Sequence, residues 1–136
     1  MTEITSLIPH RPPMQWLTAL TNLEEKSAVA TATFAAADYP MEQGRLLETA
    51  LVECMAQTVA AALGQRLQSG HTVERSSVVA MLVGVSGFKI HTRPAGGETL
   101  KIEVREKRRM GPIMMIAGLI TSNGQLVAEG DLTVYS

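Results

Sequence analysis

Apolar residues cover most of the helical surface that residues 44–66 would form. This segment reads GRLLETALVECMAQTVAAALGQR; it has no proline and is rich in residues with high helix propensity. Its leucine, valine and methionine residues do not keep to one stripe, which is typical of a helix covered by other structure on several sides. The pattern predicts one long central helix from Gly44 to Arg66, with Gly44 at its start.

Three polar residues interrupt this apolar surface on a single face. Thr49, Glu53 and Gln57 are spaced four apart, so they lie one above another on a helix. A carboxylate among apolar side chains is costly unless a partner pairs with it. Glu53 is therefore either a structural acid with satisfied hydrogen bonds or a working one, and the residue pattern by itself favours the structural interpretation.

The rest of the apolar pattern predicts strands on both sides of the helix. Residues 14–23 and the alternating residues 27–34 are expected as two strands before it. Four strands are expected after it, the first with an irregularity at Gly84 and Gly87. These four strands span residues 77–90, 100–108, 113–122 and 125–135.

The order of these elements predicts the fold class. Asn123 and Gly124 give a strong two-residue hairpin signal between the last two strands. Two strands, a buried helix and four strands joined as antiparallel neighbours form an α+β arrangement with one sheet against one helix. At this length we expect a single domain over residues 1–136.

Composition and charge exclude several classes of function. The net charge of −1 gives no general attraction to nucleic acid or to an anionic membrane. A single cysteine, Cys54, excludes an intrachain disulfide and a cysteine-based zinc site. The histidines are far apart and no nucleotide-binding glycine motif occurs, so we expect neither a metal nor a cofactor. With no signal-peptide pattern and a central helix too polar to span a membrane, the expected location is the cytoplasm.

Four segments, in order along the chain, match one known pattern. They are LIPHRPP at residues 7–13, VECMAQ at 52–57, FKIHTRPAGG at 88–97, and residues 108–110 with the strand that follows them. Together they resemble the 3-hydroxyacyl-ACP dehydratase branch of the hot-dog superfamily. The first two segments look closest to the dehydratase-like subunits of aryl-polyene and polyketide-type pathways. The resemblance implies a hot-dog fold, in which a curled antiparallel sheet of about six strands wraps one long central helix.

The resemblance also implies an activity and a set of site residues. Members of this family remove water from a 3-hydroxyacyl thioester, giving a 2,3-unsaturated thioester. A glutamate on the helix acts there with a histidine from the loop before the helix. The match assigns the role of general acid/base to Glu53 and a supporting hydrogen bond to Gln57. It also points to the helix N-terminus, near Gly44, as the place that binds the thioester oxygen.

The loop before the helix departs from the family pattern. It reads Ala37-Asp38-Tyr39-Pro40, where the family has Gly-His-Phe-Pro. Asp38 is one candidate to replace the missing histidine. His10, in the Pro-His-Arg match, is another, although an anchoring role is favoured for it. Tyr39 is expected to contact the substrate.

Two other functions stay open beside the dehydratase. The missing histidine suggests a non-catalytic acyl-binding protein or partner subunit of a heteromeric dehydratase, and the same fold could support an acyl thioesterase. We expect acyl-ACP or acyl-CoA as substrate, and a homodimer or a heterodimer with another hot-dog subunit. A cluster of basic residues could dock an acidic carrier protein or could be a solvated strand end. The cluster comprises Arg105, Lys107, Arg108 and Arg109.

Overall fold

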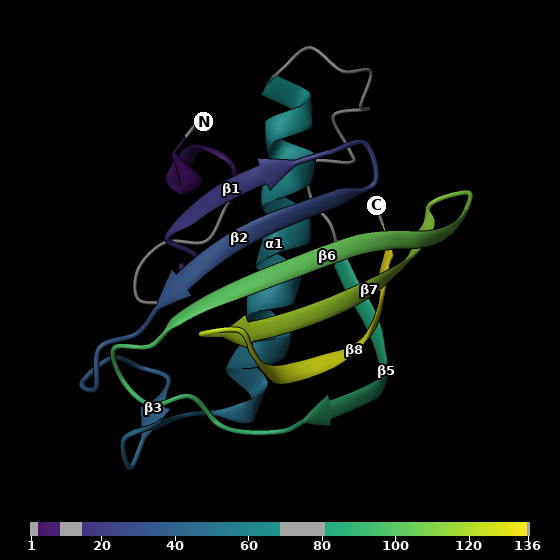
Figure 1. The fold of residues 1–136 in the computed structure, drawn as a ribbon. Helices are drawn as coiled ribbons and strands as arrows, with labels where there is room; N and C mark the ends of the chain where they lie inside the picture. The colour runs from purple at the N-terminus through teal and green to yellow at the C-terminus, as the bar shows by residue number, and fades with distance from the viewer. Residues whose placement is uncertain (1–2, 9–14, 69–80, 136) are drawn as a thin grey trace.

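The computed structural model describes residues 3–8, 15–68 and 81–135, and in it one long helix lies behind an antiparallel sheet (Figure 1). The helix α1 is Glu48–Gln68, and a short 3-10 helix η1, Ile4–Ser6, precedes the first strand. The strands are β1 Ala19–Leu23, β2 Ser27–Thr33, β3 Met41–Glu42, β4 Arg45–Leu46, β5 Met81–Ile90, β6 Thr99–Met110, β7 Ile113–Ser122 and β8 Gln125–Tyr135.

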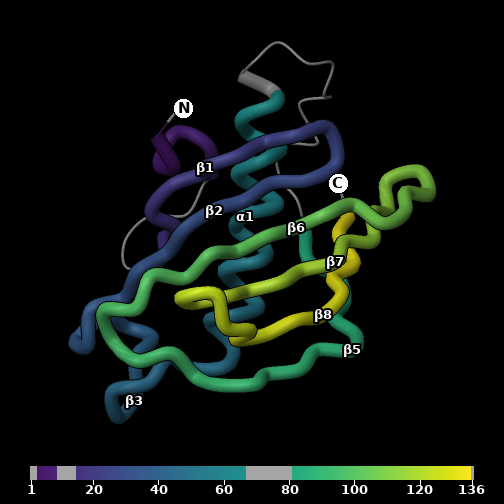
Figure 2. Tube along the Cα trace, in the orientation of Figure 1, coloured from purple at the N-terminus to yellow at the C-terminus, as the bar shows by residue number. Residues whose placement is uncertain are grey.

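Six of these strands form one sheet in the order β1-β2-β6-β7-β8-β5, with every neighbouring pair antiparallel. The chain therefore returns from the helix to the far edge of the sheet before it fills the centre, as the colour sequence of the tube shows (Figure 2). This order places β2 beside β6, so segments on either side of the helix in sequence are joined by a full ladder of pairs.

The sheet buries its inner face against α1. Along β7 the side chains alternate between buried and half-buried from Ile113 to Ser122, as expected for a strand with one face on a core. Gly118, on the inner face, accommodates the side chain of Met55, whose sulfur occupies the space that a Cβ would need. Leu51, Cys54 and Met55 are fully buried, which agrees with the prediction of a helix covered on several sides.

The N-terminal segment packs against the far half of the helix. Ile4 and Leu7 are buried members of the core, and the backbone of Leu7 crosses α1 at Gly64. A Cβ at Gly64 would overlap the carbonyl group of Leu7. Further along, the guanidinium of Arg66 donates to the carbonyl of Glu24 at 2.6 Å, which ties the helix to the β1–β2 turn.

Most of the predicted strands are confirmed. β7 and β8 have the predicted bounds, and Asn123 and Gly124 form the turn between them with φ of 51° and 78°. The irregularity in β5 is also confirmed, because its register on β8 shifts between Leu82 and Gly84 and again between Ser86 and Lys89. The first four residues of that predicted strand, 77–80, lie outside the described residues.

Three predictions about the elements are wrong. The helix begins at Glu48 instead of Gly44, because Gln43 and Gly44 form the turn of a small hairpin, β3–β4, with φ of 52° and 77°. Residues 15–18 are not part of a strand, so β1 begins only at Ala19. Finally, β5 pairs with β8 and not with its chain neighbour β6.

Replacing Gly64 with alanine is expected to lower the free energy of unfolding by about 1–3 kcal/mol, because the added methyl group must displace the Leu7 backbone. The sign is diagnostic, since alanine otherwise favours a helix over glycine by roughly 1 kcal/mol. Urea unfolding followed by circular dichroism measures the change. Gly84→Ala is the control, as its Cβ would lie at an ordinary 3.7 Å from the side chain of Thr133. A Gly64→Ala protein more stable than wild type would contradict the packing of the N-terminal segment on α1.

Candidate functional site

Glu53 and Gln57 form a hydrogen-bonded pair on α1. They are one helical turn apart, and Nε2 of Gln57 donates to Oε1 of Glu53 at 3.3 Å. Gln57 is fully buried and Glu53 is half-buried, so the carboxylate lies at the margin of the core. The predicted partnership of these two side chains is therefore present in the structure.

The other end of the Gln57 amide is bound by a segment far away in sequence. The backbone N–H of Trp16 donates to Oε1 of Gln57 at 3.0 Å in a buried hydrogen bond. The indole of Trp16 is 9% exposed and packs edge-on against Phe34, with ring centroids 6.0 Å apart. Its centroid also lies 6.5 Å from that of Tyr39. Sequence analysis missed this role of Trp16, because a backbone donor leaves no signature in the residue pattern.

Asp38 lies in the loop between β2 and β3 and holds that loop together. Its carboxylate accepts a hydrogen bond from the backbone N–H of Ala35 at 2.8 Å, while its own N–H donates to the Ala35 carbonyl at 2.9 Å. The carbonyl of Asp38 accepts from Met41 N–H at 2.8 Å. This pattern is a turn closed by an aspartate side chain. The neighbouring Tyr39 is 62% exposed, so its ring is open to a ligand apart from its contact with Trp16.

Gly44 lies in the β3–β4 turn and not at the start of the helix. A Cβ at Gly44 would meet nothing within 4 Å, so close packing is not what requires glycine at this position. The positive φ of the turn is what favours glycine. The predicted role of Gly44 in substrate binding assumed that this residue begins the helix. The helix begins at Glu48, so that role stays a prediction and has lost the position that supported it. His10, the other candidate for the missing histidine, lies outside the described residues.

Two arginines fix the hairpin in front of the helix. Nε of Arg93 donates to the carbonyl of Leu46 at 2.8 Å, and Nη1 of Arg45 donates to the carbonyl of Arg93 at 3.1 Å. An isolated bridge between Arg45 and Ala95 adds to this contact. These bonds attach the β3–β4 hairpin, and with it the entry to α1, to the chain just before β6.

The basic cluster on β6 is divided by a bulge. The register of β6 on β7 shifts between Glu106 and Arg108. As a result, Arg105 and Arg108 both lie opposite β7 residues that point away from the helix, whereas Arg109 lies opposite the buried Met114. Arg109 pairs with Glu106 at 3.0 Å. The outer face of the sheet therefore keeps two arginines that would fall on opposite faces without the bulge.

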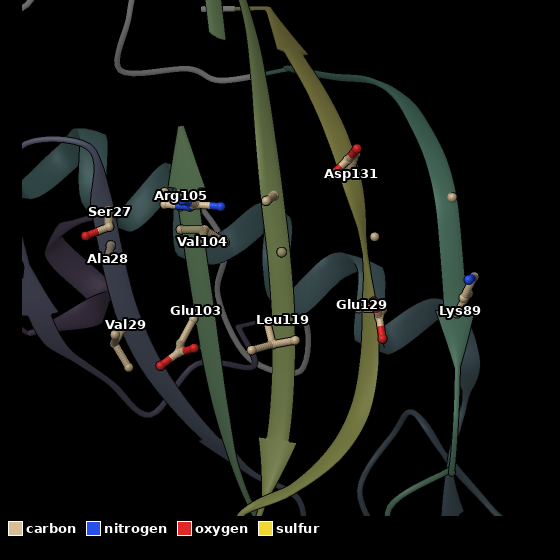
Figure 3. Close-up of a pocket in the computed structure, with 14 residues that line it drawn as sticks. Ser27, Ala28, Val29, Lys89, Glu103, Val104, Arg105, Leu119, Glu129 and Asp131 are labelled. Carbon is tan, nitrogen blue, oxygen red and sulfur yellow. The ribbon is translucent and has the colours of Figure 1, made fainter. Parts of the chain in front are cut away.

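A groove of about 690 Å³ crosses the outer face of the sheet (Figure 3). It carries mixed charge, and among the described residues its lining includes Arg105 of the basic cluster but not Glu53, Gln57, Asp38, Tyr39 or Gly44. Its side chains come from β2, β6, β7, β8 and β5, and those labelled in the figure include Val29, Glu103, Arg105, Leu119, Glu129 and Lys89. The groove is thus separate from the Glu53–Gln57 pair, which belongs to the helix on the inner side.

In the described part of the chain, no group of three or more histidine, cysteine, aspartate or glutamate side chains is arranged to hold a metal ion. Among the same residues, no helix is both long and apolar enough to cross a membrane.

Comparison with known proteins identifies the family. Residues 2–136 match a family described as ApeP-like, ApeP dehydratase. The chain belongs to this ApeP-like dehydratase family. It is also 31% identical over 137 residues to a 3-hydroxyacyl-[acyl-carrier-protein] dehydratase FabZ of Roseiflexus sp. (strain RS-1), an alignment that covers 96% of this chain and 91% of the relative. A FabZ of Geobacillus thermodenitrificans (strain NG80-2) is likewise 31% identical, over 140 residues that cover 96% and 90% of the two chains.

Solved structures confirm the hot-dog fold for this ApeP-like protein. A structure described as the dehydratase heterocomplex ApeI:P from Xenorhabdus doucetiae superposes with a TM-score of 0.86 at 20% identity, covering 100% of this chain and 91% of that one. The E. coli PaaI protein from the phenylacetic acid degradation operon superposes with a TM-score of 0.69 at 14% identity, covering 86% and 81%. The expectation of a dehydratase-like hot-dog protein related to FabZ is therefore confirmed at the level of family and fold.

The thiol of Cys54 is expected to be inert in the folded protein. Burial raises the pKa of this thiol to about 12, and the neighbouring Glu53 carboxylate acts in the same direction. Since the thiolate is the reactive form, a thiol reagent at pH 8 should label essentially none of the native protein. In urea the same reagent should label one thiol per chain, and Cys54→Ser should abolish that signal. Rapid labelling of the native protein would show that this part of α1 is open to solvent.

Proposed function

We propose that this ApeP-like protein acts as a 3-hydroxyacyl thioester dehydratase, with Glu53 as general acid/base. The observation that carries the proposal is the hydrogen-bonded pair of Glu53 and Gln57 on the buried helix. A carboxylate at the edge of a core is an unusual position unless it has a function or a full set of partners. The relatives named as FabZ dehydratases support the functional interpretation.

The reaction moves two protons. A base removes a proton from C2 of the acyl chain, the hydroxyl group on C3 takes up a proton and leaves as water, and the double bond forms between C2 and C3. Glu53 can serve one of these transfers or both in turn. In the first case a second group is needed close to the substrate. Asp38 is poorly suited to be that group, because its carboxylate already accepts the Ala35 N–H in an exposed turn.

A second hot-dog subunit is our proposed source of the missing group. Its docking surface on this chain would be the open edge of β5, a strand of ten residues at the border of the sheet. Met81, Val83 and Val85 are 59%, 53% and 42% exposed along it. A long edge strand with apolar side chains and no proline offers unpaired backbone groups to another strand. The similar structure from Xenorhabdus doucetiae is described as a dehydratase heterocomplex, which supports a second subunit here.

We propose an acyl carrier protein as the substrate's carrier. Arg105 and Arg108 share the outer face of β6 because of the bulge, and Lys107 beside them pairs with Asp131 at 3.0 Å. Neighbouring cations of this kind attract an acidic protein surface. The names of the FabZ relatives, which specify the carrier protein, support the same choice for this chain.

Glu53→Gln is expected to lower kcat by at least about 100-fold, because the amide cannot accept or donate the proton in question. The assay follows formation of the 2,3-unsaturated product from 3-hydroxyacyl-ACP, with the protein alone and mixed with a histidine-bearing FabZ-type subunit. Glu48→Gln, on the exposed first turn of α1, is the control and should keep full activity. Turnover only in the mixture would assign this chain to a two-subunit enzyme, and release of free acid would assign it to the thioesterases. Full activity of Glu53→Gln in both assays would overturn the proposal.

A double substitution, Val83→Glu with Val85→Glu, is expected to separate this protein from its partner subunit, because it places like charges along the β5 edge. Sedimentation analysis of the chain alone and of the mixture should show the loss of a dimer. Met110→Glu is the matched control, since Met110 is equally exposed at 53% but lies on the β6–β7 hairpin. A dimer that survives the β5 change and dissociates with Met110→Glu would move the interface to that hairpin.

A further inference from the structure

We propose that Trp16 is a positioning residue that acts through Gln57 to orient the carboxylate of Glu53 for proton transfer. This inference rests on the proposed dehydratase function and adds a component to its site. It starts from two hydrogen bonds in series, from the Trp16 backbone to Gln57 and from Gln57 to Glu53.

The direction of the series follows from the chemistry of its ends. The backbone N–H of Trp16 can only donate, so the atom of Gln57 that faces it must be the carbonyl oxygen Oε1. The amide nitrogen Nε2 is then turned toward Glu53, where it can only donate as well. The orientation of a glutamine amide is often ambiguous, but here a backbone donor determines it.

One oxygen of Glu53 is thereby assigned to Gln57. Oε1 accepts the hydrogen of Nε2, and this bond holds the carboxylate in a defined orientation relative to Gln57. The carboxylate is in this way oriented before the substrate arrives, which is the condition for efficient proton transfer.

The Trp16 N–H is held in place by its own side chain. Residues 15–18 are not part of a strand, and the chain meets the sheet at Thr18, whose N–H donates to the Thr31 carbonyl at 2.7 Å. The indole ring is nearly buried and packs against Phe34 at the end of β2 and against Tyr39 in the loop before the hairpin. The ring therefore anchors the backbone N–H of Trp16, two residues before the bond from Thr18 to the sheet.

The test compares Trp16→Ala, Gln57→Leu and the double variant in whichever assembly turns over 3-hydroxyacyl-ACP. Each single change is expected to lower kcat about 10- to 100-fold with little change in KM, because the carboxylate loses its orientation while the substrate contacts remain. The double variant should be no slower than Gln57→Leu, since both residues act through one series of bonds. Trp16→Phe, which keeps an aromatic anchor, should restore most of the activity.

Two controls separate positioning from packing. Leu20→Ala removes a buried side chain from β1 and should lower stability to urea without lowering kcat per folded molecule. By NMR, the side-chain amide hydrogens of Gln57 should exchange with solvent at least about 10-fold faster in Trp16→Ala than in Leu20→Ala, a readout that needs no enzymatic activity.

The outcomes distinguish this inference from the proposed function. If Glu53→Gln abolishes dehydration while the losses from Trp16→Ala and Gln57→Leu multiply, or while Gln57 exchange is unchanged in Trp16→Ala, the positioning role is wrong and the function stands. If Glu53→Gln keeps full activity, the proposed function fails whatever Trp16 does.

Discussion

Burial of α1 by the curled sheet is the constraint on which the rest of this structure depends. A helix covered by β1, β2, β6 and β7 has no water with which to satisfy a polar side chain, so Gln57 must find its partners within the protein. It finds the backbone of Trp16 on one side and the carboxylate of Glu53 on the other. On a different face of α1, the side chain of Met55 fills the space beside Gly118 on the sheet, where a larger residue would have to displace it. The Glu53–Gln57 pair and the contact with the centre of the sheet therefore lie on different faces of one helix.

The order of strands decides what remains available to other molecules. Because β6 pairs with β2, the centre of the sheet is filled by the chain's own strands and β5 is left at the border. Its apolar, exposed side chains lie on the strand that directly follows the helix in sequence. On this arrangement a partner subunit that adds to the sheet would approach the chain through β5. In the proposed two-subunit enzyme, this edge is where the second chain would be joined to the sheet.

The sequence predicted those features that depend on local pattern. The alternation in β7 and β8 and the Asn123–Gly124 turn are short-range signals, and both strands have the predicted bounds. Gln43–Gly44 has nearly the same φ angles as Asn123–Gly124. Glutamine is not a usual residue at positive φ, so the sequence carries no hairpin signal here and predicts the start of the helix instead. The place of β5 and the bond from Trp16 to Gln57 join residues far apart in the chain. Such contacts are set by the packing of the whole sheet and have no local pattern.

Glu53 illustrates how the residue pattern and the family resemblance combine with the geometry. The residue pattern alone favoured a structural acid, and the family resemblance favoured a catalytic one. The geometry serves both interpretations, because the bond from Gln57 gives a structural acid a partner and would orient a catalytic one. The hydrogen bond to one oxygen of Glu53 offsets part of the cost of removing the carboxylate from water, and it also orients the carboxylate. The carboxylate of Asp38 likewise accepts one bond, but it closes an exposed turn instead of lying at the margin of the core. For a reaction that moves two protons, the proposed dehydratase would take one carboxylate from α1, and the exposed Asp38 turn offers no second carboxylate held at the margin of the core in the same way.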